Sequence, residues 1–179
     1  QHSSEARLTR CVISRDGKKS RELTRDMVGG ISIHESIEQP LMCGTITISD
    51  SKNFINEYPI QGGETIEMEF KTTFSDIPIE YSFVISRITN RHIKNKTQAY
   101  TLLLVSPEFL INESIRVQDP LEGNPETIVQ KMLGKEYLNS SKEFFSEPSR
   151  FEVKLNPAKT RPFNIISSLI RRSVSSKTT

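Results

Sequence analysis

The sequence predicts a mainly β, α+β fold: an antiparallel β-barrel domain followed by the start of a helix-containing second domain. Apolar and polar residues alternate with a period of two in several segments before residue 106, which is typical of half-buried antiparallel strands. Helix-start signals appear only after that point. Because strands grouped before helices do not fit an alternating β/α order, we expect a β-domain in residues 1–106. The helix-containing segment, truncated at its C-terminus, is expected in residues 107–179.

The clearest alternation lies in three segments, residues 31–37, 45–49 and 65–70. One row of side chains is apolar, and we expect it to be covered: Ile46, Ile48, Ile66, Met68 and Phe70. The opposite row is polar and contains no Lys or Arg: Ser32, His34, Ser36, Thr45, Thr47, Ser49, Thr65, Glu67 and Glu69. We therefore expect one covered face and one polar face, and the polar face lacks the reactive groups that usually interrupt such a face in an enzyme.

Three further strands complete the predicted β-domain. Residues 8–14 form the first, which ends at a turn over Asp16-Gly17. Residues 79–88 and 97–105 form the other two, and the second of these is the most apolar strand of the chain. The alternation slips near Val84-Ile85, which predicts a β-bulge.

Two charged segments are expected to form loops. Residues 18–26 carry dense charge and predict an exposed connection. Residues 89–96 predict a basic hairpin loop that holds Arg91, Lys94 and Lys96. These cations could contact nucleic-acid phosphates, but no aromatic residues are interleaved with them, so we interpret the loop as a solvated hairpin tip.

Helices are predicted in the last third of the chain. Ser106-Pro107-Glu108 indicates a short helix, and Asn124-Pro125 begins a second one that ends at Gly134. A short strand is expected at 151–155, and Pro162 opens a last helix with Arg171-Arg172 at its C-terminal end. The sequence ends soon after this helix, and no later segment could cover its apolar stripe. We interpret this as truncation.

Composition excludes several classes of protein. The chain has 179 residues, a net charge of +2 and 35% hydrophobic residues, so it has no overall field that would attract nucleic acid. No apolar run approaches the ~20 residues that span a bilayer, so we expect no membrane insertion. Cys11 and Cys43 have no metal-ligand spacing. We interpret both as buried thiols, which fits assembly in a reducing cytoplasm.

The candidates for catalysis are few. His2, His34 and His92 have no second ligand at metal-binding spacing. Glu67 and Glu69 point to the same side of a strand; a glycosidase pair would need separated carboxylates in a cleft, and two solvated acids are the simpler interpretation. No Ser lies in a Gly-x-Ser-x-Gly elbow, although a Ser/His/Asp triad assembled by folding stays open. We expect no enzyme activity, cofactor or metal.

Several motifs resemble a known family in their order and spacing. The resemblance is to the first tube domain of the baseplate hub protein of contractile-tailed bacteriophages, and it covers roughly residues 30–173. The segments that carry it are His34-Glu-Ser-Ile37, residues 44–53, residues 60–68, residues 100–112 and residues 126–134.

The resemblance implies a structural role. In that family the hub is a homotrimer with two tail-tube-like β-domains per subunit, and the resulting ring adapts the tail tube to the central spike. The implied partners are the protein itself, tail-tube or tube-initiator proteins, the spike protein, and DNA that passes without specific binding. The implied location is the baseplate of a virion assembled in the bacterial host cytoplasm. One departure is that a second tube domain is missing from this sequence.

Two sets of residues are candidates for these roles. A tube that passes DNA should not hold phosphates tightly, so we expect the polar row to face the lumen, at Thr45, Thr47, Glu67 and Glu69. A plain solvent-facing side of the sheet is the alternative. Strands at the ends of a sheet leave unpaired backbone groups, so residues 31–37 or 45–49 are expected at a subunit boundary, with Ile31, Ile33, Ile46 and Ile48 as candidate contacts.

Two other functions remain open from the sequence. The chain could be a tail-tube or spike-hub component of a related contractile injection or secretion system, which shares the fold and differs in its neighbours. It could also be an enzyme or ligand-binding β-barrel, such as a baseplate-associated hydrolase. An enzyme predicts a pocket with converging polar groups, whereas a hub predicts extended, partly apolar faces between subunits.

Overall fold

The computed structural model describes residues 6–36, 41–73, 75–94 and 97–177. The chain divides into two compact units: unit 1 comprises Gln1–Glu35 and Met42–Ser106, and unit 2 comprises Ser36–Leu41 and Pro107–Thr179. Among the described helices, none has the length and apolar character needed to cross a membrane.

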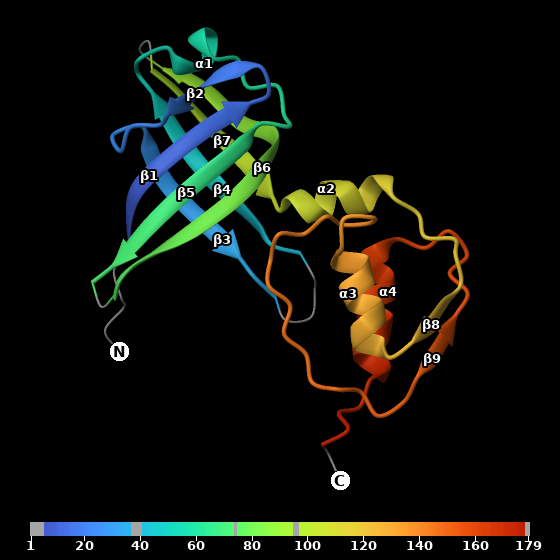
Figure 1. Cartoon of the computed structure of the whole chain (residues 1–179). Helices are drawn as coiled ribbons and strands as arrows, with labels where there is room; N and C mark the ends of the chain where they lie inside the picture. The colour runs from blue at the N-terminus through green and yellow to red at the C-terminus, as the bar shows by residue number, and fades with distance from the viewer. Residues whose placement is uncertain (1–5, 37–40, 74, 95–96, 178–179) are drawn as a thin grey trace. The chain divides into compact units, whose positions relative to one another are not determined.

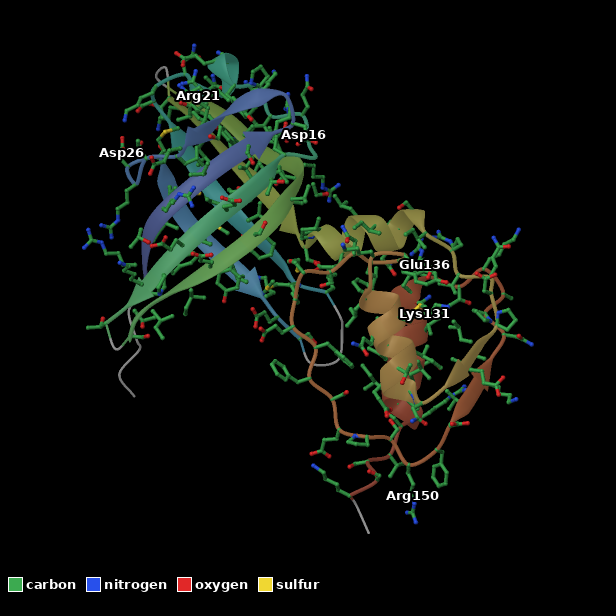
Figure 2. The ribbon with its side chains drawn as sticks, viewed as in Figure 1. Asp16, Arg21, Asp26, Lys131, Glu136 and Arg150 are labelled. Atoms are coloured by element: carbon green, nitrogen blue, oxygen red, sulfur yellow. The ribbon has the colours of Figure 1, made fainter. Side chains whose placement is uncertain are left out.

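Unit 1 is one curved antiparallel sheet of seven strands in the order β2-β1-β5-β6-β7-β4-β3 (Figure 1). This confirms the predicted mainly β fold. The strands are β1 Ala6–Arg15, β2 Lys18–Glu22, β3 Val28–His34, β4 Cys43–Asp50, β5 Thr65–Thr72, β6 Ser75–Lys94 and β7 Thr97–Val105. Charged side chains such as Asp16, Arg21 and Asp26 lie on its outside (Figure 2).

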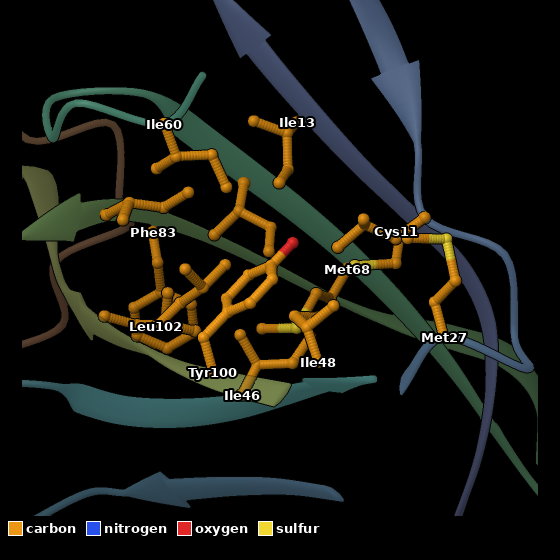
Figure 3. Packing of buried hydrophobic residues seen from close by; sticks show 14 of the residues in the cluster. Cys11, Ile13, Met27, Ile46, Ile48, Ile60, Met68, Phe83, Tyr100 and Leu102 are labelled. Carbon is orange, nitrogen blue, oxygen red and sulfur yellow. The ribbon is translucent and has the colours of Figure 1, made fainter. Parts of the chain in front are cut away.

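The core of unit 1 is built from the inward rows of these strands. Tyr100 and Leu102 of β7 pack among side chains of the facing strands (Figure 3). Ile46, Ile48, Ile66 and Met68 are buried as the alternation predicts, and Phe70 is partly buried. Each fully buried large aliphatic side chain stabilises the fold by roughly 1.5–3 kcal/mol relative to exposure, so the register of each strand is strongly specified.

The three segments with the clearest alternation do not form one continuous block. β3 pairs with β4, but β6 and β7 separate β4 from β5 in the sheet. The expectation that they form one continuous face is therefore wrong. The connection from β4 to β5 contains helix α1, Phe54–Glu57, and local alternation does not encode which strands a connection of this length brings together.

The segment after β1 also differs from the prediction. The turn at Asp16-Gly17 is present, with Gly17 at φ 74°, but residues 18–22 form strand β2 rather than a loop. All five residues of β2 are exposed, so the strand has no buried row that alternation could reveal. It forms because the hairpin places it beside β1, with Val12 opposite Glu22.

β6 is a 20-residue strand that serves two neighbours. Its first half pairs with β5 and its second half with β7 (Figure 1). The register with β7 shifts between Ile85 and Arg87, next to the predicted bulge at Val84-Ile85. The strand extends to Lys94, so most of the predicted basic loop is strand. Lys96 lies outside the described residues.

Unit 2 combines helices with a short hairpin. Its elements are α2 Pro107–Ser114, β8 Leu121–Gly123, α3 Pro125–Leu133, β9 Val153–Leu155 and α4 Pro162–Arg172. α3 and α4 lie side by side (Figure 1), and they bury Ile128, Met132 and Leu169 in a common core. The apolar stripe of α4 therefore packs within its own unit, and the expectation that it lacks a partner in this sequence is wrong. Ile170, however, remains 60% exposed.

Candidate subunit interface

The sheet of unit 1 leaves strand edges unpaired. β3 is the last strand of the sheet, and within the described part of the chain it pairs only with β4. β2 covers the edge of β1 only from Val12 to Arg15, which leaves the first half of β1 without a neighbour on that side among the described residues. Unpaired backbone groups on such edges can accept a further strand.

An apolar groove opens where these strands end. We call it the seam groove, and it has a volume of about 430 Å³. Side chains from four strands line it: Ala6, Leu8, Ile31, Ile33, Phe70, Ile79 and Tyr81. The rings of Phe70 and Tyr81 meet edge to face, with centroids 5.9 Å apart. None of the described residues that line it is charged, so its chemistry suits an apolar occupant.

The groove lies where the inward row of β6 passes from the buried core to the surface. Along β6 the inward row runs from Phe83, which is fully buried, through the partly buried Tyr81 to Ile79, 45% exposed, and Ile77, 77% exposed. Monomeric proteins rarely leave a contiguous apolar row uncovered. The apolar row of β6 therefore extends to Ile79 and Ile77, which the described residues of unit 1 do not cover.

The predicted boundary residues fall into two groups. Ile31 and Ile33 line the seam groove on edge strand β3 and are available for contact. Ile46 and Ile48 have no exposed surface, and their strand β4 is paired on both sides, with β3 and β7. These two side chains belong to the core, and the structure contradicts a direct boundary role for them.

The predicted lumen residues all lie on the outward side of the sheet, but in two separate places. Thr45 and Thr47 are on β4, whereas Glu67 and Glu69 are on β5, with β6 and β7 between them. A wall that contains both pairs must also contain the outward side chains of β6 and β7. One of these is Leu103, which lies opposite Thr45.

The sequence predicts a polar face without positive charge, but the outward face around β5 carries cations. Arg10 of neighbouring β1 lies 3.8 Å from Glu67, and Lys71 follows Glu69 in phase along β5. The Thr9 hydroxyl donates to Glu69 Oε1 at 2.7 Å. The expectation of a cation-free face is wrong here, because β1 contributes its own charges to the pairs with β5.

The buried carboxylates of unit 1 already accept hydrogen bonds from their own surroundings. Asp50 accepts from the backbone amides of Phe54 and Ile55, both at 2.9 Å. Glu64 accepts from the amide of Gln61 at 2.9 Å and pairs with Arg15. These contacts hold the connection between β4 and β5 in place.

The structure also places the histidines and cysteines that were considered as metal ligands or thiols. His34 Nε2 lies 3.0 Å from the Ser32 hydroxyl on exposed β3, and His92 is exposed. The described residues contain no group of three or more His, Cys, Asp or Glu side chains that could hold a metal ion. Cys11 and Cys43 are free thiols; burial raises the pKa of Cys11 to about 12, while Cys43 is only partly buried.

These features define a class of fold: a curved antiparallel β-barrel with an open seam, followed in the chain by a helical unit. No protein-family model and no curated protein sequence matches the chain. Among solved structures, the tail protein from Neisseria meningitidis MC58 is similar over 90% of this chain and 44% of its own, at 10% identity and a TM-score of 0.58.

A second similar structure is the Francisella PdpA-VgrG complex, half-lidded. The match covers 92% of this chain and 28% of that one, at 10% identity and a TM-score of 0.50. The chain therefore spans less than half the length of either solved chain. At such identities the likeness shows a shared fold.

Sequence reasoning found only part of the seam groove. The sequence predicts Ile31 and Ile33 as contact residues at a subunit boundary, but it does not predict this role for Leu8, Ile79 and Tyr81. The available signal was the alternation Ile77-x-Ile79-x-Tyr81, which continues the inward row past the buried Phe83.

Proposed function

We propose that this chain is a non-enzymatic structural subunit of a contractile tail, in which unit 1 serves as a tail-tube-like ring domain. In this proposal the protein is the homotrimeric baseplate hub. It adapts the tail tube, or a tube-initiator protein, to the central spike and lets DNA pass. It acts in the virion baseplate after assembly in the host cytoplasm.

One observation carries the proposal. Among the described residues, strand β3 of unit 1 has a neighbouring strand on one side only, and beside it lies an apolar groove that these residues leave uncovered. Both features are satisfied when subunits meet edge to edge, because the neighbour supplies backbone partners and apolar cover together. The shared fold with a tail protein supports the same assignment.

The outward face of the sheet is our candidate for the channel wall. It presents Thr45 and Thr47 on β4 and Glu67 and Glu69 on β5. Arg10 and Lys71 offset the glutamates locally, so the β4 side is the more neutral part of the face. DNA would move past such a surface with few lasting phosphate contacts.

A closely related function is a second candidate. The likeness to a VgrG-containing complex favours a spike-hub component of a related injection or secretion system. This alternative shares the ring and differs in the partners, so the two are separated by which spike and tube proteins copurify with the chain.

Assembly through β3 is tested by proline substitution at matched edge positions. Ser32 and His34 turn their backbone groups toward β4, so the N–H of Ile33 between them points away from the sheet. Ile33→Pro in β3 removes this edge N–H, and Ser20→Pro is the matched substitution in edge strand β2; Ile33 is partly exposed and Ser20 is exposed. We expect native mass spectrometry to show a trimer for the wild type and for Ser20→Pro. For Ile33→Pro we expect about tenfold weaker assembly, on the scale of a lost hydrogen bond.

The control is the fold of each variant, measured by far-UV circular dichroism and thermal unfolding. A folded Ile33→Pro protein with unchanged assembly would remove β3 from the subunit boundary. A wild-type chain that stays monomeric at high concentration would contradict the ring itself.

A further inference from the structure

The β6–β7 hairpin carries an exposed apolar side chain among cations. Ile93 is 69% exposed near the end of β6, opposite Gln98 of β7. The Arg91 guanidinium donates to Gln98 Oε1 from Nε at 3.2 Å and from Nη2 at 2.7 Å. His92 and Lys94 flank Ile93 and are exposed. The hairpin therefore presents one isoleucine on a braced, basic end.

The seam groove lies at the other end of the same strand. Ile79 and Tyr81 contribute to the groove from the half of β6 that pairs with β5, whereas Ile93 is in the half that pairs with β7 (Figure 1). Ile93 follows Ile79 by fourteen positions, which corresponds to about 45 Å along an extended strand. Ile93 and the groove of one chain therefore cannot meet.

Ile77 of the same strand is not an occupant of the groove. Ile77 is in phase with Ile79, so it lengthens the apolar row of the groove instead of filling it. An exposed isoleucine and an apolar groove on one chain, placed so that they cannot meet, are complementary between two copies.

We propose that Ile93 of one copy inserts into the seam groove of a second copy, so that the copies associate head to tail through opposite ends of β6. Such a contact is heterologous, and repeated copies form a ring when the rotation between them closes. The inference rests on the proposed function only in that it names one contact between copies of the chain.

One acidic side chain near the groove, Glu35, fits the basic end of the hairpin, whereas Arg7 and Lys71 beside the lining residues do not. Glu35 follows β3, and its charge acts on Tyr81 in the groove, where burial first and Glu35 second raise the pKa of the tyrosine. A carboxylate at this rim would meet Lys94 and His92 of the incoming hairpin. Such rim pairs act mainly on association rate and respond to salt.

The first experiment replaces the inserted side chain. Ile93→Asp should weaken self-association of the full chain at least tenfold in sedimentation velocity, because a charge would enter an apolar groove. Phe145→Asp is the matched control; Phe145 is an apolar side chain of unit 2 that is 86% exposed. Both positions are on the surface, so both variants should keep the wild-type circular dichroism spectrum. Equal association by Ile93→Asp and wild type would overturn the inference.

The second experiment identifies the contact directly. Chains that carry Ile93→Cys are mixed with chains that carry Ile33→Cys, both in a Cys43→Ser background, and are oxidised mildly. We expect a disulfide-linked heterodimer, and none when Phe145→Cys replaces Ile93→Cys.

The outcomes separate this inference from the proposed function. Oligomers without the 93–33 crosslink would overturn the inference and leave the hub proposal standing. A crosslink in open chains that never close into a trimer would support the inference and contradict the homotrimer. A wild-type monomer without crosslink would overturn both.

Discussion

Each unit uses one buried glutamate to attach an irregular segment to regular structure, but the two glutamates are held differently. In unit 1, Glu64 has a fully buried side chain and pairs with Arg15, which is itself only 20% exposed. In unit 2, Glu108 of α2 accepts from the Ser140 hydroxyl at 2.8 Å and lies 3.4 Å from Lys142, which is 56% exposed. Both partners of the Glu64 pair are largely shielded from water, whereas the lysine of the Glu108 pair is exposed to it.

The comparison shows how burial sets the value of an ion pair. Water screens Lys142, so the Glu108 pair should contribute little beyond its hydrogen bond. Loss of one partner from the Glu64 pair would leave a charge in a poorly solvated place, which is costly. We therefore expect unit 1 to depend on its glutamate far more than unit 2 does.

The largest expected effect is Glu64→Gln. The substitution keeps the shape of the side chain but leaves Arg15 without its carboxylate, and Arg15 also donates to the Pro59 carbonyl at 2.8 Å. We expect unit 1 to lose about 3–5 kcal/mol of unfolding free energy, measured by urea titration. A loss below about 1 kcal/mol would mean that Arg15 finds solvent easily, and the contrast between the units would disappear.

The smaller expected effect on stability is Glu108→Gln. The variant should lose about 1 kcal/mol near neutral pH, in line with one net hydrogen bond. Burial favours the protonated form of Glu108, but hydrogen bonds from its own amide, Ser140 and Lys142 outweigh it and lower the pKa of the carboxyl.

The pH dependence of this variant follows from that direction. A pKa that is lower in the folded chain makes the glutamate stabilising above its unfolded pKa, near 4.3. That contribution is lost as pH falls through the folded value. The difference between wild type and Glu108→Gln should therefore shrink on acidification from pH 5. If the difference in unfolding free energy grew on acidification, the pKa of Glu108 would be raised in the folded chain instead of lowered.

Much of unit 1 follows from local pattern, and the exceptions have physical causes. Alternation located β3, β4 and β5, because their inward side chains are buried in register. It could not distinguish β3, an edge strand, from β4, which has neighbours on both sides. Ile31 and Ile46 therefore received the same predicted role, although only Ile31 is accessible.

The candidate site was harder to predict because it depends on the order of strands. The seam groove collects residues from β1, β3, β5 and β6, and the sequence gives no direct sign that these strands end together. The adjacent glycines of Gln61-Gly-Gly-Glu64 are a direct signal of a turn. Gly62 and Gly63 have φ of 95° and 88°, but the ion pair from Glu64 to Arg15 depends on a residue 49 positions earlier.

The smallest expected effect on folding belongs to the proposed channel wall. Thr45→Lys with Thr47→Lys should leave assembly intact, because Thr47 is exposed and Thr45 is partly exposed on the outward side of β4. In a closed ring the substitution adds a belt of cations that contacts passing phosphates. Each contact steepens the slope of log binding constant against log salt concentration by about 0.9. We expect DNA ejection from assembled particles to slow at low salt and to recover at high salt. The matched control is Ser51→Lys, an exposed position just after β4. Normal ejection at low salt, in particles that carry both lysines, would assign this face to the exterior of the ring.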